Sequence, residues 1–285
     1  MKNFPKIGLA LSGGGAKGIA HVGVIQELEK LNVPISCVSG TSMGALVGAW
    51  FAAGKDFKVL LDIFQSNKWR KYLHFSEMVS SVKVDGGLFS LKFFKDFLDK
   101  EFRGLDVEDL EKKYCAVATS LKTGKKVELK SGRLSDAVLA SICLPVVFSP
   151  VKMGDDLLVD GGLQENFPVD TCFGLGADVV IGSDVRYAPS YLHEEIKDTK
   201  HPLQWKIFKV LSYLMEMVNV QQEKQESDKL VIIKPYVSHV STFDFDRSRE
   251  ILKLGEEAFA EKEDKIRQVL KLPQKEKSWW EMLFE

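Results

Sequence analysis

The sequence predicts an α/β fold, in which a mostly parallel central sheet is covered by helices in a three-layer α/β/α arrangement. The first observation is that strand, turn and helix alternate twice between residues 7 and 53, as they do where crossover helices join strands. The second is the run Asp178-Val179-Val180-Ile181-Gly182-Ser183, which is almost continuously apolar, as expected of a central parallel strand.

Hydrophobic spacing and turn residues define the first four elements. Ile7–Leu11 is a short apolar run and predicts a strand. Residues 18–31 carry apolar side chains at helical spacing, and a Val-Pro pair stops the helix that they predict. Ile35–Ser39 predicts a second strand. The small apolar residues from Met43 to Ala53 predict a helix that ends at the next glycine.

Further elements follow along the chain. Strands are expected over residues 114–119, 126–130, 157–159, 179–185 and 230–233, and helices over residues 91–102, 134–142, 204–222 and 246–270. Beyond residue 185 the composition changes, and a polar, exposed loop is expected over residues 187–201. We therefore expect residues 1–185 to form the core and residues 186–285 a mainly helical extension packed on it, the two forming one structural unit.

Composition argues against several classes of function. The net charge of the 285 residues is −1, so the overall charge does not favour nucleic acid as a partner. The first apolar run is too short for a signal peptide, and no run approaches the roughly 20 apolar residues of a membrane-spanning helix. The four cysteines are far apart in the sequence and form no C-x-x-C pair, so we expect reduced thiols. Neither the cysteines nor the five histidines have metal-ligand spacing. We expect a cytoplasmic protein without a metal or cofactor.

The segment Gly40-Thr41-Ser42-Met43-Gly44 lies between the second predicted strand and the second predicted helix. A serine on a sharp strand-to-helix turn presents its hydroxyl outward, and glycine is needed two residues before and after it because side chains would collide there. The N-terminus of the following helix favours negative charge. This pattern is typical of the nucleophile of a serine hydrolase and singles out Ser42.

A second motif, Ser12-Gly13-Gly14-Gly15-Ala16-Lys17-Gly18, lies between the first strand and the first helix. Its backbone N–H groups can converge on an anion, so it fits an oxyanion hole, a dinucleotide-binding loop or a plain tight turn. A dinucleotide site requires an acidic residue about 20 positions later, and a P-loop requires a Gly-Lys-Ser/Thr ending; both are missing. The nearby Ser42 segment favours the oxyanion hole.

Two kinds of residue are candidates for the base that would activate Ser42. Asp160 follows the apolar run Leu157–Val159 and precedes two glycines, which by itself is typical of a turn. A histidine is the usual alternative, and only His239 follows a late strand candidate. A lone histidine there is more typical of the surface, and His21 is more typical of helix packing near the glycine turn.

These motifs, taken in order, resemble the patatin-like phospholipases over the first 185 residues, and the short bacterial members most of all. The resemblance is carried by Gly13–Gly18, Gly40–Gly44, Leu139-Ala140-Ser141, Leu144-Pro145, Asp160-Gly161-Gly162 and Asn166-Phe167-Pro168-Val169. It implies a patatin-like fold and a Ser–Asp dyad without a catalytic histidine. One departure is Lys17, where the family usually has arginine; lysine keeps the charge but lacks the planar fork.

The resemblance implies a role for each motif residue. Ser42 is the nucleophile, Asp160 is the base, and the oxyanion hole is formed by Gly13, Gly14 and Gly15. The remaining motif residues support these loops; they are Lys17, Gly18, Gly40, Gly44, Gly161 and Gly162. The implied activity is hydrolysis of lipid acyl esters by a phospholipase, lysophospholipase or carboxylesterase; the alternative is a catalytically weak regulator or scaffold. A carboxylate base also requires partial desolvation, so we expect apolar surroundings at Asp160.

The expected partners rest on the family resemblance and on the tail Ser278–Phe284, in which bulky apolar residues are concentrated. The expected substrate is a lipid or another ester. One interpretation of the tail is an interfacial anchor, which would place the protein at the membrane periphery. The other, which the sequence favours, is packing on its own core or on a second copy in a homo-oligomer.

Overall fold

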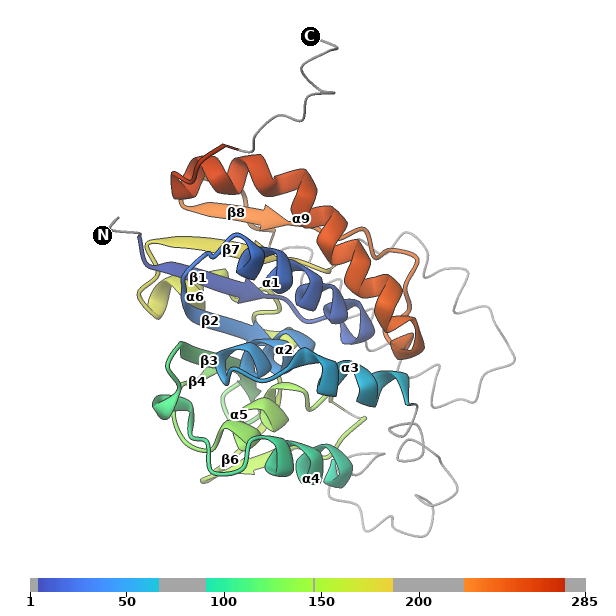
Figure 1. The fold of residues 1–285 in the computed structure, drawn as a ribbon. Helices are drawn as coiled ribbons and strands as arrows, with labels where there is room; N and C mark the ends of the chain where they lie inside the picture. Colours follow the sequence, from blue (N-terminus) through green and yellow to red (C-terminus); the bar gives the residue numbers. More distant parts are fainter. Residues whose placement is uncertain (1–4, 67–90, 146, 187–222, 275–285) are drawn as a thin grey trace.

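A computed structural model of the chain describes residues 5–66, 91–145, 147–186 and 223–274 (Figure 1). Eight strands form one sheet in the order β5-β6-β3-β2-β1-β7-β8, with β4 paired to β3 beside this path. The strands are β1 Ile7–Leu11, β2 Ile35–Thr41, β3 Lys113–Ser120, β4 Lys126–Leu129, β5 Val151–Met153, β6 Asp156–Asp160, β7 Val179–Ser183 and β8 Leu230–Ile233.

The central strands β3, β2, β1, β7 and β8 run parallel to one another, whereas β4 and β6 pair antiparallel with β3. The parallel centre confirms the predicted α/β class, and its antiparallel edge was not predicted. Because β1, β2 and β7 are parallel, their C-terminal ends lie at one edge of the sheet, where ligand sites of open α/β sheets form.

Helices cover both faces of the sheet. They are α1 Ala20–Lys30, α2 Met43–Ala52, α3 Phe57–Gln65, α4 Lys92–Glu101, α5 Leu134–Ser141, α6 Val169–Gly174 and α9 Ser248–Leu270. In Figure 1, α1, α2 and α9 lie in front of the sheet, and α6 lies behind it against β1, β2 and β7. The front layer encloses the larger apolar core, and a smaller cluster around Phe167 and Cys172 fills the back.

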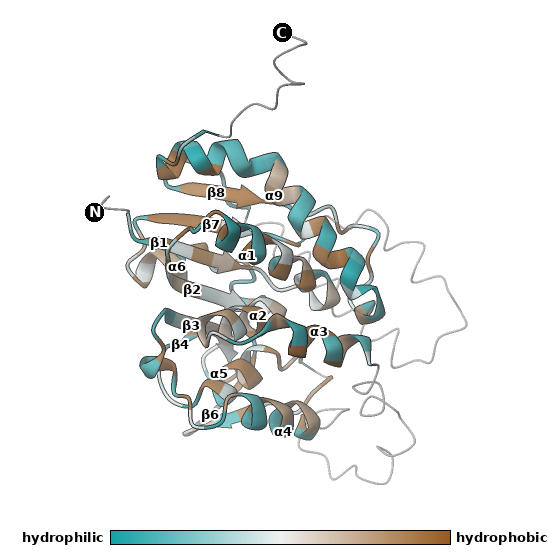
Figure 2. Cartoon of the chain, viewed as in Figure 1, coloured by the Kyte–Doolittle hydropathy of each residue, from teal (hydrophilic) through white to brown (hydrophobic). Residues whose placement is uncertain are grey.

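Helices α1 and α9 cross with their backbones in close contact. A Cβ atom on Gly23 of α1 would lie 2.2 Å from the carbonyl oxygen of Leu252, and one on Gly255 of α9 would lie 2.0 Å from that of Ala20. Figure 2 shows hydrophilic residues along the outer side of α9 and apolar strands β7 and β8 beside it. Helix α9 is therefore an amphipathic cover whose approach to α1 depends on two glycines.

The structure differs from the predicted elements in several places. Strand β5, which is short and only partly buried, was not predicted, and neither were α3 and α6. Strand β2 extends to Thr41 because Gly40 and Thr41 continue the pairing with β3. The helix α1 begins at Ala20, after a 3-10 turn over Gly15–Ile19. The predictions for residues 187–201, 204–222 and the tail fall outside the described residues.

Two elements from the chain beyond residue 185 lie against elements from before it. Strand β8 pairs with β7, and α9 packs on α1. Among the described helices, none combines the length and the apolar character that crossing a bilayer requires.

Candidate active site

Ser42 occupies a strained position between β2 and α2. Its backbone has φ 54° and ψ −121°, a conformation that non-glycine residues adopt at a cost of about 1–3 kcal/mol. A Cβ atom on Gly40 would lie 2.3 Å from the carbonyl oxygen of Gly44, and one on Gly44 would lie 2.3 Å from that of Leu11. Both glycines are therefore needed for the turn to close, as the spacing predicted.

Ser141 at the end of α5 holds the Ser42 backbone. The Ser42 N–H donates to Ser141 Oγ at 3.0 Å, and this hydroxyl donates to the carbonyl of Val117 in β3 at 2.6 Å. The helix α2 begins at the residue after Ser42. The turn is thus fixed from β3 as well as from its own strand.

Asp160 ends β6 and is fully buried. Its Oδ1 accepts from the Gly162 N–H at 2.8 Å, whereas its buried Oδ2 has no hydrogen-bond partner among the described residues. Burial raises the pKa of this carboxyl to about 6, although the Gly162 N–H and the Ser42 hydroxyl act in the opposite direction. Asp160 and Ser42 line the same pocket, and the Ser42 hydroxyl makes no hydrogen bond of ordinary geometry to Oδ2.

The glycine loop lies opposite Ser42. The Gly13 N–H donates to both the backbone carbonyl and the side-chain Oδ1 of Asn166, each at 3.0 Å. The N–H groups of Gly14 and Gly15 have no acceptor among the described residues, and the following Ala16 N–H donates to the carbonyl of Thr242 at 2.8 Å. Of the three glycines expected to supply donors, Gly13 is therefore already occupied, and Gly14 and Gly15 are open.

The remaining motif residues pack around these loops. Lys17 is buried in the 3-10 turn that follows the glycine loop. A Cβ atom on Gly18 would lie 2.4 Å from Met43 Cγ, and one on Gly161 would lie 2.3 Å from the carbonyl oxygen of Val117. These contacts bring the glycine loop against α2 and the Asp160 loop against β3. Gly162 supplies the N–H bonded to Asp160.

A pocket of about 70 Å³ joins the serine, the aspartate and the glycine loop. The described residues that line it are Gly13, Gly14, Gly15, Ser42, Leu144, Asp160, Asn166, Val185, Arg186 and Thr242. Arg186 makes a two-point ion pair with Asp184, at 2.8 Å from Nε to Oδ1 and from Nη2 to Oδ2. Its guanidinium also lies over the ring of Phe167, 5.1 Å from the ring centre. With a volume of about 70 Å³, the pocket has the size of a reacting ester group.

His21 contacts the backbone just before the glycine loop. It is fully buried, with Nε2 2.8 Å from the carbonyl oxygen of Ser12 and Nδ1 2.7 Å from Ser183 Oγ. Burial lowers the pKa of His21 to about 4, so the ring is neutral near pH 7. Because the carbonyl can only accept, Nε2 carries the proton. This agrees with a packing role near the turn.

The other candidates lie elsewhere. His239 is on the surface, with Nε2 3.4 Å from Glu250 Oε1, and it does not line the pocket. Within the described ranges, no group of three histidine, cysteine or acidic side chains could hold a metal ion. Sequence reasoning missed the contacts of Ser141, Asn166 and Arg186. Ser141 and Asn166 had a signal, since each lies in a segment that carries the family resemblance, whereas Arg186 had none.

Comparison with known proteins identifies the family of the chain. The family model described as patatin-like phospholipase matches residues 9–173. The chain is 37% identical over 181 residues to an uncharacterized NTE family protein of Mycobacterium tuberculosis, covering 62% of this chain and 48% of that protein. It is 27% identical over 274 residues to lysophospholipase nte1 of Aspergillus fumigatus, covering 87% of this chain and 18% of that protein.

A solved structure of human GIVD cytosolic phospholipase A2 aligns with 94% of this chain and 58% of that chain, at 13% identity and a TM-score of 0.48. The chain spans less than half the length of the two curated relatives named above. The match over residues 9–173 covers more than half of the chain. The chain therefore belongs to the patatin-like phospholipase family.

Proposed function

We propose that the protein is a serine acyl hydrolase that cleaves lipid acyl esters with a Ser42–Asp160 dyad. The observation that carries this proposal is the buried Oδ2 of Asp160, which has no partner among the described residues, in a residue that lines the same pocket as the strained Ser42. A buried carboxylate oxygen without a partner costs free energy, so its retention beside a serine hydroxyl fits a proton acceptor. Family membership supports lipid esters as the substrate class.

The proposed reaction has two halves. With a pKa of about 6, Asp160 is mostly ionised at pH 7 and can take the proton of Ser42 Oγ as that oxygen bonds to the ester carbonyl carbon. The carbonyl π electrons move to the oxygen, which accepts hydrogen bonds from the Gly14 and Gly15 N–H groups. When the C–O bond to the alcohol breaks, Asp160 returns the proton to the leaving alkoxide. Water then hydrolyses the acyl-enzyme by the same steps.

A fluorophosphonate probe and a lipid panel test the proposal. We expect the probe to label the wild type, to spare Ser42→Ala completely, and to label Asp160→Asn slowly. The exposed Ser66 at the end of α3 provides a control, Ser66→Ala, that should label like the wild type. Fatty acid release from phospholipid, lysophospholipid, monoacylglycerol and acyl thioester, followed by mass spectrometry, should fall at least about 10³-fold in Ser42→Ala.

Two results would argue against the proposal. Release of fatty acid by Ser42→Ala at the wild-type rate would remove Ser42 from the reaction. Absence of both labelling and release across the whole panel would favour a regulator or scaffold built on the same fold.

A further inference from the structure

The segment Glu165–Pro168 contacts two of the loops that form the pocket. The Thr41 hydroxyl, one residue before Ser42, donates to the carbonyl of Glu165 at 2.7 Å. The Ser39 hydroxyl donates to the carbonyl of Pro168, also at 2.7 Å. The glycine loop is joined to the same segment through Asn166. One short stretch of chain therefore spans the serine turn and the glycine loop.

Asn166 makes the most direct of these contacts. Its backbone oxygen and its side-chain Oδ1 both accept the single N–H of Gly13. The approach is so close that a Cβ atom on Gly13 would lie 2.3 Å from Asn166 Oδ1. Because the N–H of Gly13 needs an acceptor, the carboxamide oxygen is the atom that faces it. Fixing this peptide plane restricts where the next two N–H groups point.

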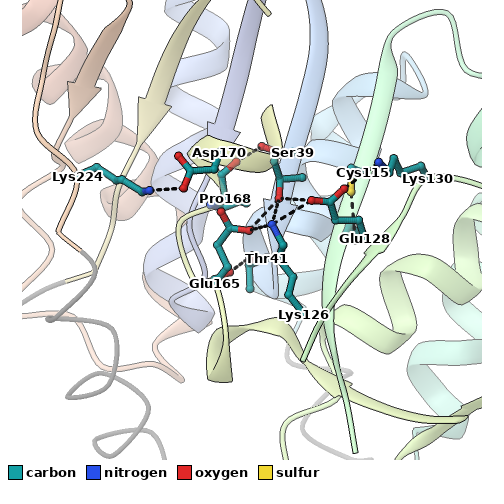
Figure 3. Close-up of polar contacts among 12 residues, drawn as sticks. Ser39, Thr41, Cys115, Lys126, Glu128, Lys130, Glu165, Pro168, Asp170 and Lys224 are labelled. Carbon is teal, nitrogen blue, oxygen red and sulfur yellow. Dashed lines mark hydrogen bonds and ion pairs between the residues drawn. The ribbon is translucent and has the colours of Figure 1, made fainter. Parts of the chain in front are cut away.

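An ion-pair cluster fixes the other side of the segment. The Glu165 carboxylate, on a side chain only 11% exposed, accepts from Lys126 Nζ and from the Thr171 hydroxyl, each at 2.8 Å. Lys126 Nζ also lies 3.0 Å from Glu128 Oε1 in β4. Figure 3 shows Lys126 between Glu165 and Glu128, with Thr41 and Pro168 beside them. Charge-assisted hydrogen bonds of this kind hold a side chain in one geometry more firmly than neutral ones.

We propose that Asn166 is a positioning residue for the glycine loop. Its Oδ1 fixes Gly13 so that the N–H groups of Gly14 and Gly15 face the ester carbonyl, and the Lys126–Glu165–Thr171 cluster keeps Asn166 in place. The effect on turnover rests on the hydrolase function proposed above; the anchoring of the loop does not. A misaligned oxyanion donor weakens transition-state binding more than substrate binding, so the effect belongs in kcat.

The kinetic test compares Asn166→Leu with Gln164→Leu. Leucine has the same number of side-chain heavy atoms and the same branching as asparagine but no acceptor, and Gln164 is an exposed amide two residues away in the same loop. We expect Asn166→Leu to lower kcat roughly tenfold while KM stays within about twofold, and Gln164→Leu to leave both unchanged. An unchanged kcat in Asn166→Leu, or a KM that rises as much as kcat falls, would overturn the proposal.

Hydrogen–deuterium exchange tests the anchor without relying on activity. Asn166→Leu should speed deuterium uptake in the peptide that covers residues 12–19 and leave β1 and β7 unchanged. Asn166→Asp keeps an acceptor at Oδ1 and should restore most of the protection. Uptake that is unchanged in residues 12–19, or that rises throughout the sheet, would contradict a local anchor. If Ser42→Ala kept full turnover while this exchange pattern held, the proposed function would fail and the anchor would stand.

Discussion

Replacing Asp160 by asparagine should stabilise the protein at neutral pH. The pKa of the buried carboxyl is about 6, whereas its ordinary value is 3.8. The folded state therefore holds this proton more tightly than the unfolded state, and the stability that the group contributes is lost as the pH rises from about 4 to about 6. At about 1.4 kcal/mol for each pH unit between the two values, the ionised carboxylate costs about 3 kcal/mol above pH 6.

Asparagine removes that cost without removing the existing contact. Its Oδ1 can still accept from the Gly162 N–H, and its Nδ2 would take the place of the unpartnered Oδ2 beside Ser42. A gain of about 3 kcal/mol corresponds to roughly 6 °C in Tm for a chain of this size. Thermal and urea unfolding at pH 7.5 and pH 4.5 should show this gain at pH 7.5 and about a third of it at pH 4.5.

The control for this experiment is Asp155→Asn, because Asp155 is an exposed carboxylate in the same hairpin and pairs with Lys122 on the surface. It should change Tm by less than about 1 °C at both pH values. If Asp160→Asn were no more stable than the wild type at pH 7.5, or if its gain were equal at both pH values, the buried charge would not be the cause.

Three further predictions concern the same site. The pH profile of kcat/KM should fall about tenfold per pH unit below pH 6 and level off above it, because Asp160 must be ionised; activity that stays constant down to pH 4.5 would contradict this. Ser141→Ala removes the acceptor of the Ser42 N–H and should lower kcat roughly tenfold, whereas Ser135→Ala in the same helix should not; equal effects of the two variants would argue against the contact. Gly44→Ala places a methyl group 2.3 Å from the Leu11 carbonyl and should lower the free energy of unfolding by about 2 kcal/mol or more, measured by urea denaturation; a variant of wild-type stability would mean that the turn relaxes freely.

Local patterns were sufficient for much of the fold. The alternation of strands and helices near the N-terminus predicted β1, β2, α1 and α2 because each element is an apolar run or carries a helical period, and a glycine or proline lies close after it. The spacing of Gly40 and Gly44 predicted the tight turn because side chains at these two positions would collide. In the structure, a Cβ atom on either glycine would lie 2.3 Å from a backbone carbonyl oxygen. Strand β5 was not predicted because three residues, two of them partly buried and one exposed, carry too little pattern.

The details of the site depend on contacts that sequence spacing does not encode. The Ser42 N–H meets Ser141, 99 residues later, and the Gly13 N–H meets Asn166, 153 residues later. A glycine run predicts donors that can converge but not which of them the protein itself uses. The roles of Gly13 and Asn166 therefore become distinct only when the two segments lie side by side.

The crossing of α1 and α9 through Gly23 and Gly255 has a consequence for how the protein is made. The glycine loop precedes α1 and leaves the ribosome well before α9, the helix that covers α1. Until α9 and β8 emerge, one edge of β7 and part of α1 have no partner, which is a state prone to aggregation. We therefore expect the glycine loop and the Ser42 turn to reach their folded geometry only after the α9 segment has left the ribosome.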